Sequence, residues 1–114
     1  MEEWIFPIGK YSPQPYSAKL HKEWVADIKS IPSWLDHLVA NLDAEQLAVP
    51  YREGGWSCRQ IIHHLADSHM NAYVRCKLAL TEDKPAIKPY DQDAWSLLPD
   101  NDSVPVNVSI TLLH

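Results

Sequence analysis

Apolar residues recur at steps of three and four through residues 20–42, which is the period of a helix rather than of a strand. Pro32 interrupts this pattern. Because proline lacks an amide hydrogen and presses on the carbonyl four residues earlier, we expect a kink there. Asp43 can cap a short helical turn that follows. The apolar positions are Leu20, Trp24, Ile28, Ile31, Leu35, Leu38 and Leu42.

A second helix is predicted from Cys58 to about Leu80, directly after a pair of glycines. Ser57 and Gln60 are three residues apart, the spacing of a capping box in which each side chain bonds the other's backbone. At 1.5 Å per residue this helix spans roughly 35 Å, enough to cross a small domain.

The rest of the chain is rich in proline. Residues 1–17 are predicted to form an extended arm over the core. Residues 81–105 form a long connection with a short helical turn near 92–98. A third helix begins near Pro105, and the sequence stops at His114 with none of the usual signals that end a helix. We therefore expect the chain to be truncated within that helix.

Composition narrows the class of protein. With 114 residues, 46% hydrophobic and 22% charged, the chain 1–114 is predicted to be one globular domain. A formal charge of −5 argues against binding to a nucleic-acid backbone. No apolar run approaches the 20 or so residues that span a bilayer, and the acidic N-terminus is unlike a signal peptide. These features predict a cytoplasmic protein. Cys58 and Cys76 are too far apart on one helix to pair and are predicted to be free thiols.

The candidate chemistry lies in the second helix, where residues 63–69 read His-His-Leu-Ala-Asp-Ser-His. Neutral imidazole is a common ligand for zinc and related ions. However, His64 and His69 point roughly 140° apart on a helix, and the chain has no His-x-x-x-His pair. The spacing favours His63 and His69 as surface or hydrogen-bonded residues and leaves His64 undecided. Cys58 is a poor candidate for a nucleophile, because a cysteine without a partner base is usually a small buried hydrophobe.

Several segments together resemble a known family. They are Phe6-Pro-Ile-Gly9, Pro50-Tyr-Arg-Glu-Gly-Gly-Trp-Ser57, Arg59-Gln60, His63-His-Leu-Ala-Asp-Ser-His-Met70, Lys77-Leu-Ala-Leu-Thr-Glu82 and Lys88-Pro-Tyr-Asp91. On these motifs the chain is similar to the YfiT branch of the DinB-like family, over nearly its whole length.

The resemblance implies an all-α four-helix bundle that forms a homodimer and holds one divalent metal ion, zinc or nickel, per subunit. In that family three histidines bind the ion, and His64 matches the first. The other two belong to a His-x-x-x-His on the last helix, which this sequence does not contain. We therefore expect about half of the bundle and one of three ligands here.

The resemblance also implies an activity. Members act on small-molecule electrophiles as metal-dependent hydrolases or as S-transferases that use the thiol bacillithiol. From helix position we further expect Asp67 to orient His64 or a water, and Asn71 or Arg75 to contact substrate. The truncated chain itself is expected to be inactive. The alternative is a non-catalytic helical dimerisation or interaction module that binds no metal.

Overall fold

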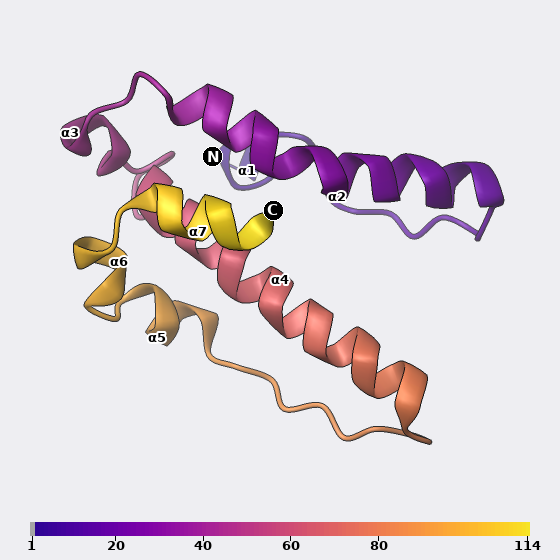
Figure 1. Ribbon diagram of the computed structural model, residues 1–114. Coiled ribbons are helices and arrows are strands. Elements are labelled where there is room, and N and C mark those ends of the chain that lie inside the picture. The colour runs from indigo at the N-terminus through magenta and orange to yellow at the C-terminus, as the bar shows by residue number, and fades with distance from the viewer. Residues whose placement is uncertain (1) are drawn as a thin grey trace.

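The computed structural model describes residues 2–114, which contain helices and no named strand. Their order and course are drawn in Figure 1. The helices are α1 (Glu2–Ile5), α2 (Ala18–Val39), α3 (Ala44–Leu47), α4 (Cys58–Thr81), α5 (Gln92–Ser96), α6 (Asp100–Ser103) and α7 (Val106–Leu113).

Side-chain caps fix where the main helices begin. Ser57 Oγ accepts a hydrogen bond from the Gln60 amide at 3.2 Å, and Gln60 Oε1 accepts one from the Ser57 amide at 2.9 Å. The same reciprocal bonds join Asp43 and Gln46 at the start of α3. Both caps agree with the sequence, because each supplies partners for amides that the first helical turn leaves unpaired.

Helix α7 is the centre of the packing. It lies against α4 and also contacts α2, while α3, α5 and α6 contact α4. In Figure 1, α2 and α4 diverge from the end of the molecule near which α7 lies. Leu47, Ile62 and Ile110 form a small buried cluster from α3, α4 and α7. Four half-buried side chains, Leu35, Val39, Cys58 and Val106, pack around it.

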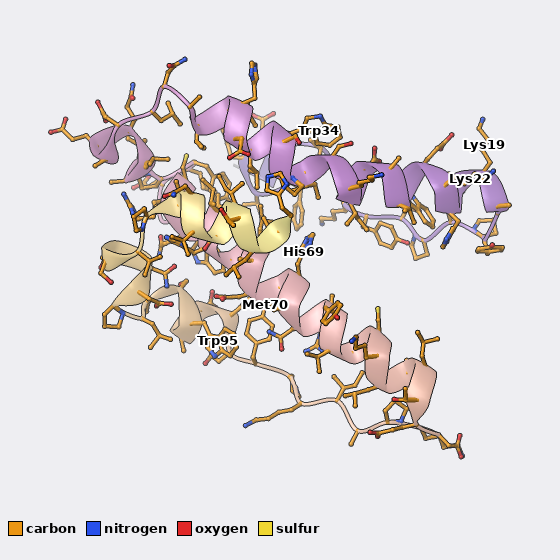
Figure 2. The ribbon with its side chains drawn as sticks, viewed as in Figure 1. Lys19, Lys22, Trp34, His69, Met70 and Trp95 are labelled. Atoms are coloured by element: carbon orange, nitrogen blue, oxygen red, sulfur yellow. The ribbon has the colours of Figure 1, made fainter. Side chains whose placement is uncertain are left out.

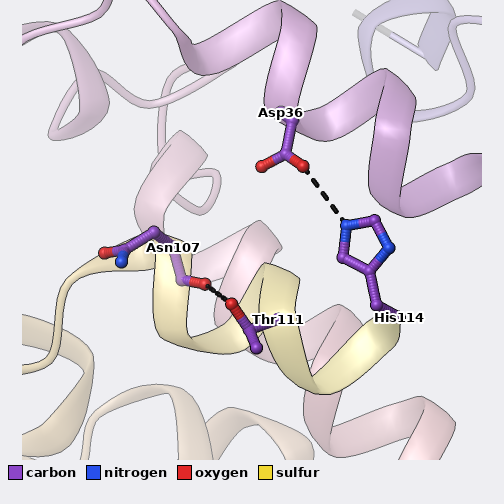
Figure 3. Close-up of polar contacts among 4 residues, drawn as sticks. All are labelled: Asp36, Asn107, Thr111 and His114. Carbon is purple, nitrogen blue, oxygen red and sulfur yellow. Dashed lines mark hydrogen bonds and ion pairs between the residues drawn. The ribbon is translucent and has the colours of Figure 1, made fainter.

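A polar contact joins the end of α7 to α2. His114 Nε2 lies 3.2 Å from Asp36 Oδ2, as Figure 3 shows. Both side chains are more than half exposed, so this pair contributes at most about 1 kcal/mol. Apolar burial on α7 is therefore the main interaction that holds the helices together.

The sequence predicted the long helices well and the short ones less well. Helix α4 ends one residue beyond the predicted limit, and α7 begins immediately after Pro105. Pro32 is buried inside α2 and does not end it. The predicted extended arm begins with the short helix α1, and α6 was not predicted. Cys58 and Cys76 are both free, as expected.

Large apolar side chains remain exposed along both long helices. Those on α2 and α4 include Trp24, Val25, Ile28, Trp34, Leu38, Met70, Tyr73, Val74 and Leu80. No helix in residues 2–114 is both long and apolar enough to cross a membrane.

Candidate functional site

His64 lies in the second turn of α4 and packs against Trp56, the residue before the helix cap. The two ring centroids are 4.9 Å apart, with the rings inclined at 73° in an edge-to-face contact. The His64 ring is half-buried, and neither ring nitrogen makes a hydrogen bond within residues 2–114. The indole thus restricts the imidazole while leaving its nitrogens available to a ligand.

The preceding residue, His63, has a different environment. It is 6% exposed, and its Nδ1 lies 2.6 Å from the hydroxyl oxygen of Ser109 on α7. Its Nε2 is buried with no hydrogen-bond partner of standard geometry among the described residues. Burial lowers the pKa of His63, and the charge of Arg59 lowers it further, against opposing effects from the Val104 backbone and two carboxylates. His63 therefore links α4 to α7 through a buried hydrogen bond, and its burial favours the neutral ring.

Asp67 lies one turn further along α4, close enough to both histidines to interact with them electrostatically. Burial raises the pKa of the Asp67 carboxyl, as does the negative charge of Asp100, while His64 and His63 act in the opposite direction. Within residues 2–114 Asp67 makes no hydrogen bond to His64. Its expected orienting role stays a prediction.

Asn71 and Arg75 follow Asp67 along α4 at steps of four residues. Asn71 Nδ2 donates to the Asp67 carbonyl at 2.8 Å, and Arg75 Nη2 donates to the Lys88 carbonyl at 3.4 Å. Both side chains are half-buried and bonded to backbone. Their expected contacts with substrate also stay predictions.

The donors present in this chain do not complete a metal site. Residues 2–114 contain no cluster of three or more His, Cys, Asp or Glu side chains that could hold an ion. A catalytic zinc site has about three protein ligands, and His64 would supply one. Figure 2 shows His69 projecting from α4 on the side that faces α2, and within residues 2–114 no hydrogen bond joins it to His64.

Two features of this environment escaped sequence reasoning. Ser109 is the partner of His63 across 46 residues, and Asp100 influences Asp67 from α6. Neither relation leaves a signal in local spacing. Trp56 stands eight residues before His64, about two helical turns, and that separation is the one sequence signal that could have indicated their contact.

Comparison with known proteins identifies the family. Residues 18–111 match the model of the DinB superfamily. A protein of Bacillus cereus strain AH820 named "Putative metal-dependent hydrolase" is 44% identical over 115 residues, covering all of this chain. A protein of Bacillus anthracis strain A0248 with the same name has the same identity. This chain spans 66% of the length of each relative.

A solved structure agrees with the fold. YfiT from Bacillus subtilis, described as a probable metal-dependent hydrolase with an unusual four-helix bundle topology, superposes with a TM-score of 0.92 at 45% identity. The match covers 97% of this chain and 64% of the YfiT chain. The helices described above therefore have the arrangement of the corresponding part of that bundle.

Proposed function

The chain belongs to the DinB superfamily, and from this premise we propose that it is part of a metal-dependent hydrolase in which His64 is a ligand of a divalent ion. The proposal rests mainly on the environment of the His64 ring. The ring packs on Trp56, and neither of its nitrogens makes a hydrogen bond within residues 2–114. The names of its relatives support the same reading.

The proposal extends to the ion and the assembly. We take the ion to be zinc or nickel, one per subunit of a homodimer, with two further histidine ligands that this sequence does not contain. Such an ion supplies Lewis acidity, which favours the deprotonated form of a water or thiol nucleophile at neutral pH. The proposed setting is the cytoplasm.

The chain's own residues orient the metal ligand, hold or release a proton, and contact the substrate in this proposal. In this proposal the edge-to-face contact with Trp56 limits the rotation of the His64 ring. The ring nitrogen that binds the ion is thereby held in one orientation. Asp67 has a raised pKa and lies near His64, which suits a carboxyl group that holds or releases a proton close to the reacting atoms. Asn71 and Arg75 lie further along the same helix and are the proposed contacts to a small-molecule substrate.

Hydrolysis and thiol transfer are the two chemistries that this arrangement would serve. The names of the relatives favour hydrolysis. Transfer of a low-molecular-weight thiol such as bacillithiol to an electrophile rests on the sequence resemblance alone. In that reaction the thiol, rather than water, would be the nucleophile that the ion activates.

One experiment separates these alternatives. The intact protein, loaded with zinc or nickel, is assayed for hydrolysis of p-nitrophenyl acetate and for coupling of bacillithiol to monobromobimane. His64→Ala and His69→Ala are tested beside it. We expect one activity to be present, abolished by His64→Ala and retained by His69→Ala. Equal rates in the two variants would refute the role of His64. An ion-free, folded and inactive protein would favour the interaction module, whose basis is the exposed apolar faces of α2 and α4.

A further inference from the structure

Two adjoining cavities are lined by residues of α1, the loop 50–57, α4 and α5. Their volumes are about 700 and 380 Å³, and both are lined by Ile5, Tyr51 and Arg52. Trp56 and Asp93 line the larger one. Pockets for small molecules usually measure a few hundred to a thousand cubic ångströms, with apolar walls and few polar groups. This hollow therefore has the size and lining of a ligand site.

The loop 50–57 that forms its floor is tightly held. The Tyr51 amide donates to the Trp56 carbonyl at 3.2 Å, and the Gly55 amide donates to the Arg52 carbonyl at 3.0 Å. Gly54 has a φ of 69°, a conformation that favours glycine. A Cβ at Gly55 would lie 2.7 Å from Arg52 Cγ and 2.9 Å from Tyr51 Cε1. The loop backbone thus packs directly beneath the two side chains and holds them in place.

Arg52 presents a fixed positive group to the cavity. Its Nε donates to the Tyr51 hydroxyl at 2.9 Å, and its Nη1 donates to the Glu53 carbonyl at 3.1 Å. The guanidinium also lies 5.4 Å from the centre of the Tyr51 ring. Its Nη2 makes no hydrogen bond within residues 2–114. A half-buried guanidinium that is already oriented is well suited to bind a carboxylate, since little entropy is lost when the ligand arrives.

Two carboxylates line the cavities and limit which other groups the ligand can carry. Glu53 lines the smaller cavity and Asp93 the larger, so a second anionic group on the ligand would be repelled. Trp56 and Ile61 add apolar surface to the larger cavity. We propose that this cavity binds a small organic monocarboxylate, with its carboxylate on Arg52, an apolar or aromatic body against Trp56, and any further polar group a hydrogen-bond donor.

The position of this cavity relates it to the candidate metal ligand. Trp56 lines the cavity and also packs edge-on against His64. A ligand held by Arg52 would thus contact the same indole that packs against His64. We take this carboxylate ligand to be the substrate. That identification rests on the proposed function, whereas the binding of a carboxylate to Arg52 does not.

The test uses 3-phenylpropionate and its neutral amide, 3-phenylpropanamide, as probes. Binding to the intact protein, the same protein as in the metal assay, is followed by chemical shifts of the Trp56 indole and the Gly54 and Gly55 amides. We expect the acid to bind and shift these signals. Both loss of the probe's charge and Arg52→Gln should weaken binding about tenfold, the effect of losing one charged hydrogen bond.

The control is Lys22→Gln, which removes one positive charge from the distant exposed end of α2 (Figure 2) and should leave binding unchanged. Gly55→Ala keeps every charge but displaces Arg52 and Tyr51, and it should also weaken binding. Circular dichroism confirms that each variant is folded. Equal binding of acid and amide, or equal affinity in Arg52→Gln and the unchanged chain, would overturn the inference.

Metal content, measured on the same samples, separates the two proposals. If the ion is bound through His64 but the carboxylate does not bind, the cavity proposal alone fails. If the carboxylate binds through Arg52 and no ion is held, the metal proposal alone fails, and the cavity remains a binding site without an assigned reaction.

Discussion

Replacing Ser109 by alanine should destabilise the fold, because within residues 2–114 it leaves His63 without its only hydrogen bond of standard geometry. Both residues are 6% exposed, and the hydroxyl lies 2.6 Å from Nδ1. Nε2 is already buried with no partner of standard geometry among the described residues, so Ser109→Ala leaves both ring nitrogens without one. A buried polar group that loses its partner costs about 1–3 kcal/mol, and we expect the free energy of unfolding to fall by that amount.

Urea denaturation followed by circular dichroism at pH 7.5 measures the change. Thr111→Ala is the matched control, because Thr111 is exposed on the same helix and donates only to the Asn107 carbonyl of its own turn (Figure 3). Its cost should stay within about 0.5 kcal/mol.

A double variant tests the cause of the loss. His63→Leu combined with Ser109→Ala replaces both polar partners by apolar groups, which can be nearly neutral when shape is kept. The pair should therefore recover much of the stability that Ser109→Ala loses. If Ser109→Ala costs no more than Thr111→Ala, the buried hydrogen bond does not stabilise the α4–α7 contact and the reasoning is refuted.

Three further outcomes are expected from the same denaturation assay. Ile110→Ala should cost about 2–5 kcal/mol because Ile110 is 1% exposed, and Val108→Ala, at a position 44% exposed, should cost far less; similar losses would contradict the assigned core. Ser57→Ala should cost about 0.5–2 kcal/mol by removing the cap of α4, whereas no loss relative to exposed Ser103→Ala would argue against that cap. Because burial lowers the pKa of His63 below its ordinary 6.5, the unfolded chain takes up this proton first, so stability should fall as the pH drops through about 6.5 toward the lower folded pKa and should not depend on this group well above 7. His63→Leu should flatten that slope, and an unchanged slope would show that another group causes it.

The sequence predicted those features of the fold that depend on interactions between residues close together in the chain. The limits of α4 follow from the reciprocal bonds of Ser57 and Gln60, which lie within one turn of each other. The YfiT-like fold was recognisable from the same motifs, and the comparisons confirm it. The short helix α6 was missed because it has no apolar period and no side-chain cap.

Residue spacing along the chain could not predict contacts between residues that are far apart in the sequence. The different environments of His63 and His64, adjacent residues in one motif, depend on which of them faces α7. Helical angles place the two side chains about 100° apart but do not say where Ser109 or Trp56 will lie. The cavity beside Arg52 likewise depends on how α1 and α5 meet the loop 50–57.

Elemental analysis of metal bound to the intact protein tests the central claim most directly. The unchanged protein, His64→Ala and His69→Ala are purified in parallel, and the ions per chain are measured. The account predicts one divalent ion per chain in the unchanged protein and in His69→Ala, and its loss in His64→Ala. An ion retained in full by His64→Ala, or absent from all three proteins, would contradict it.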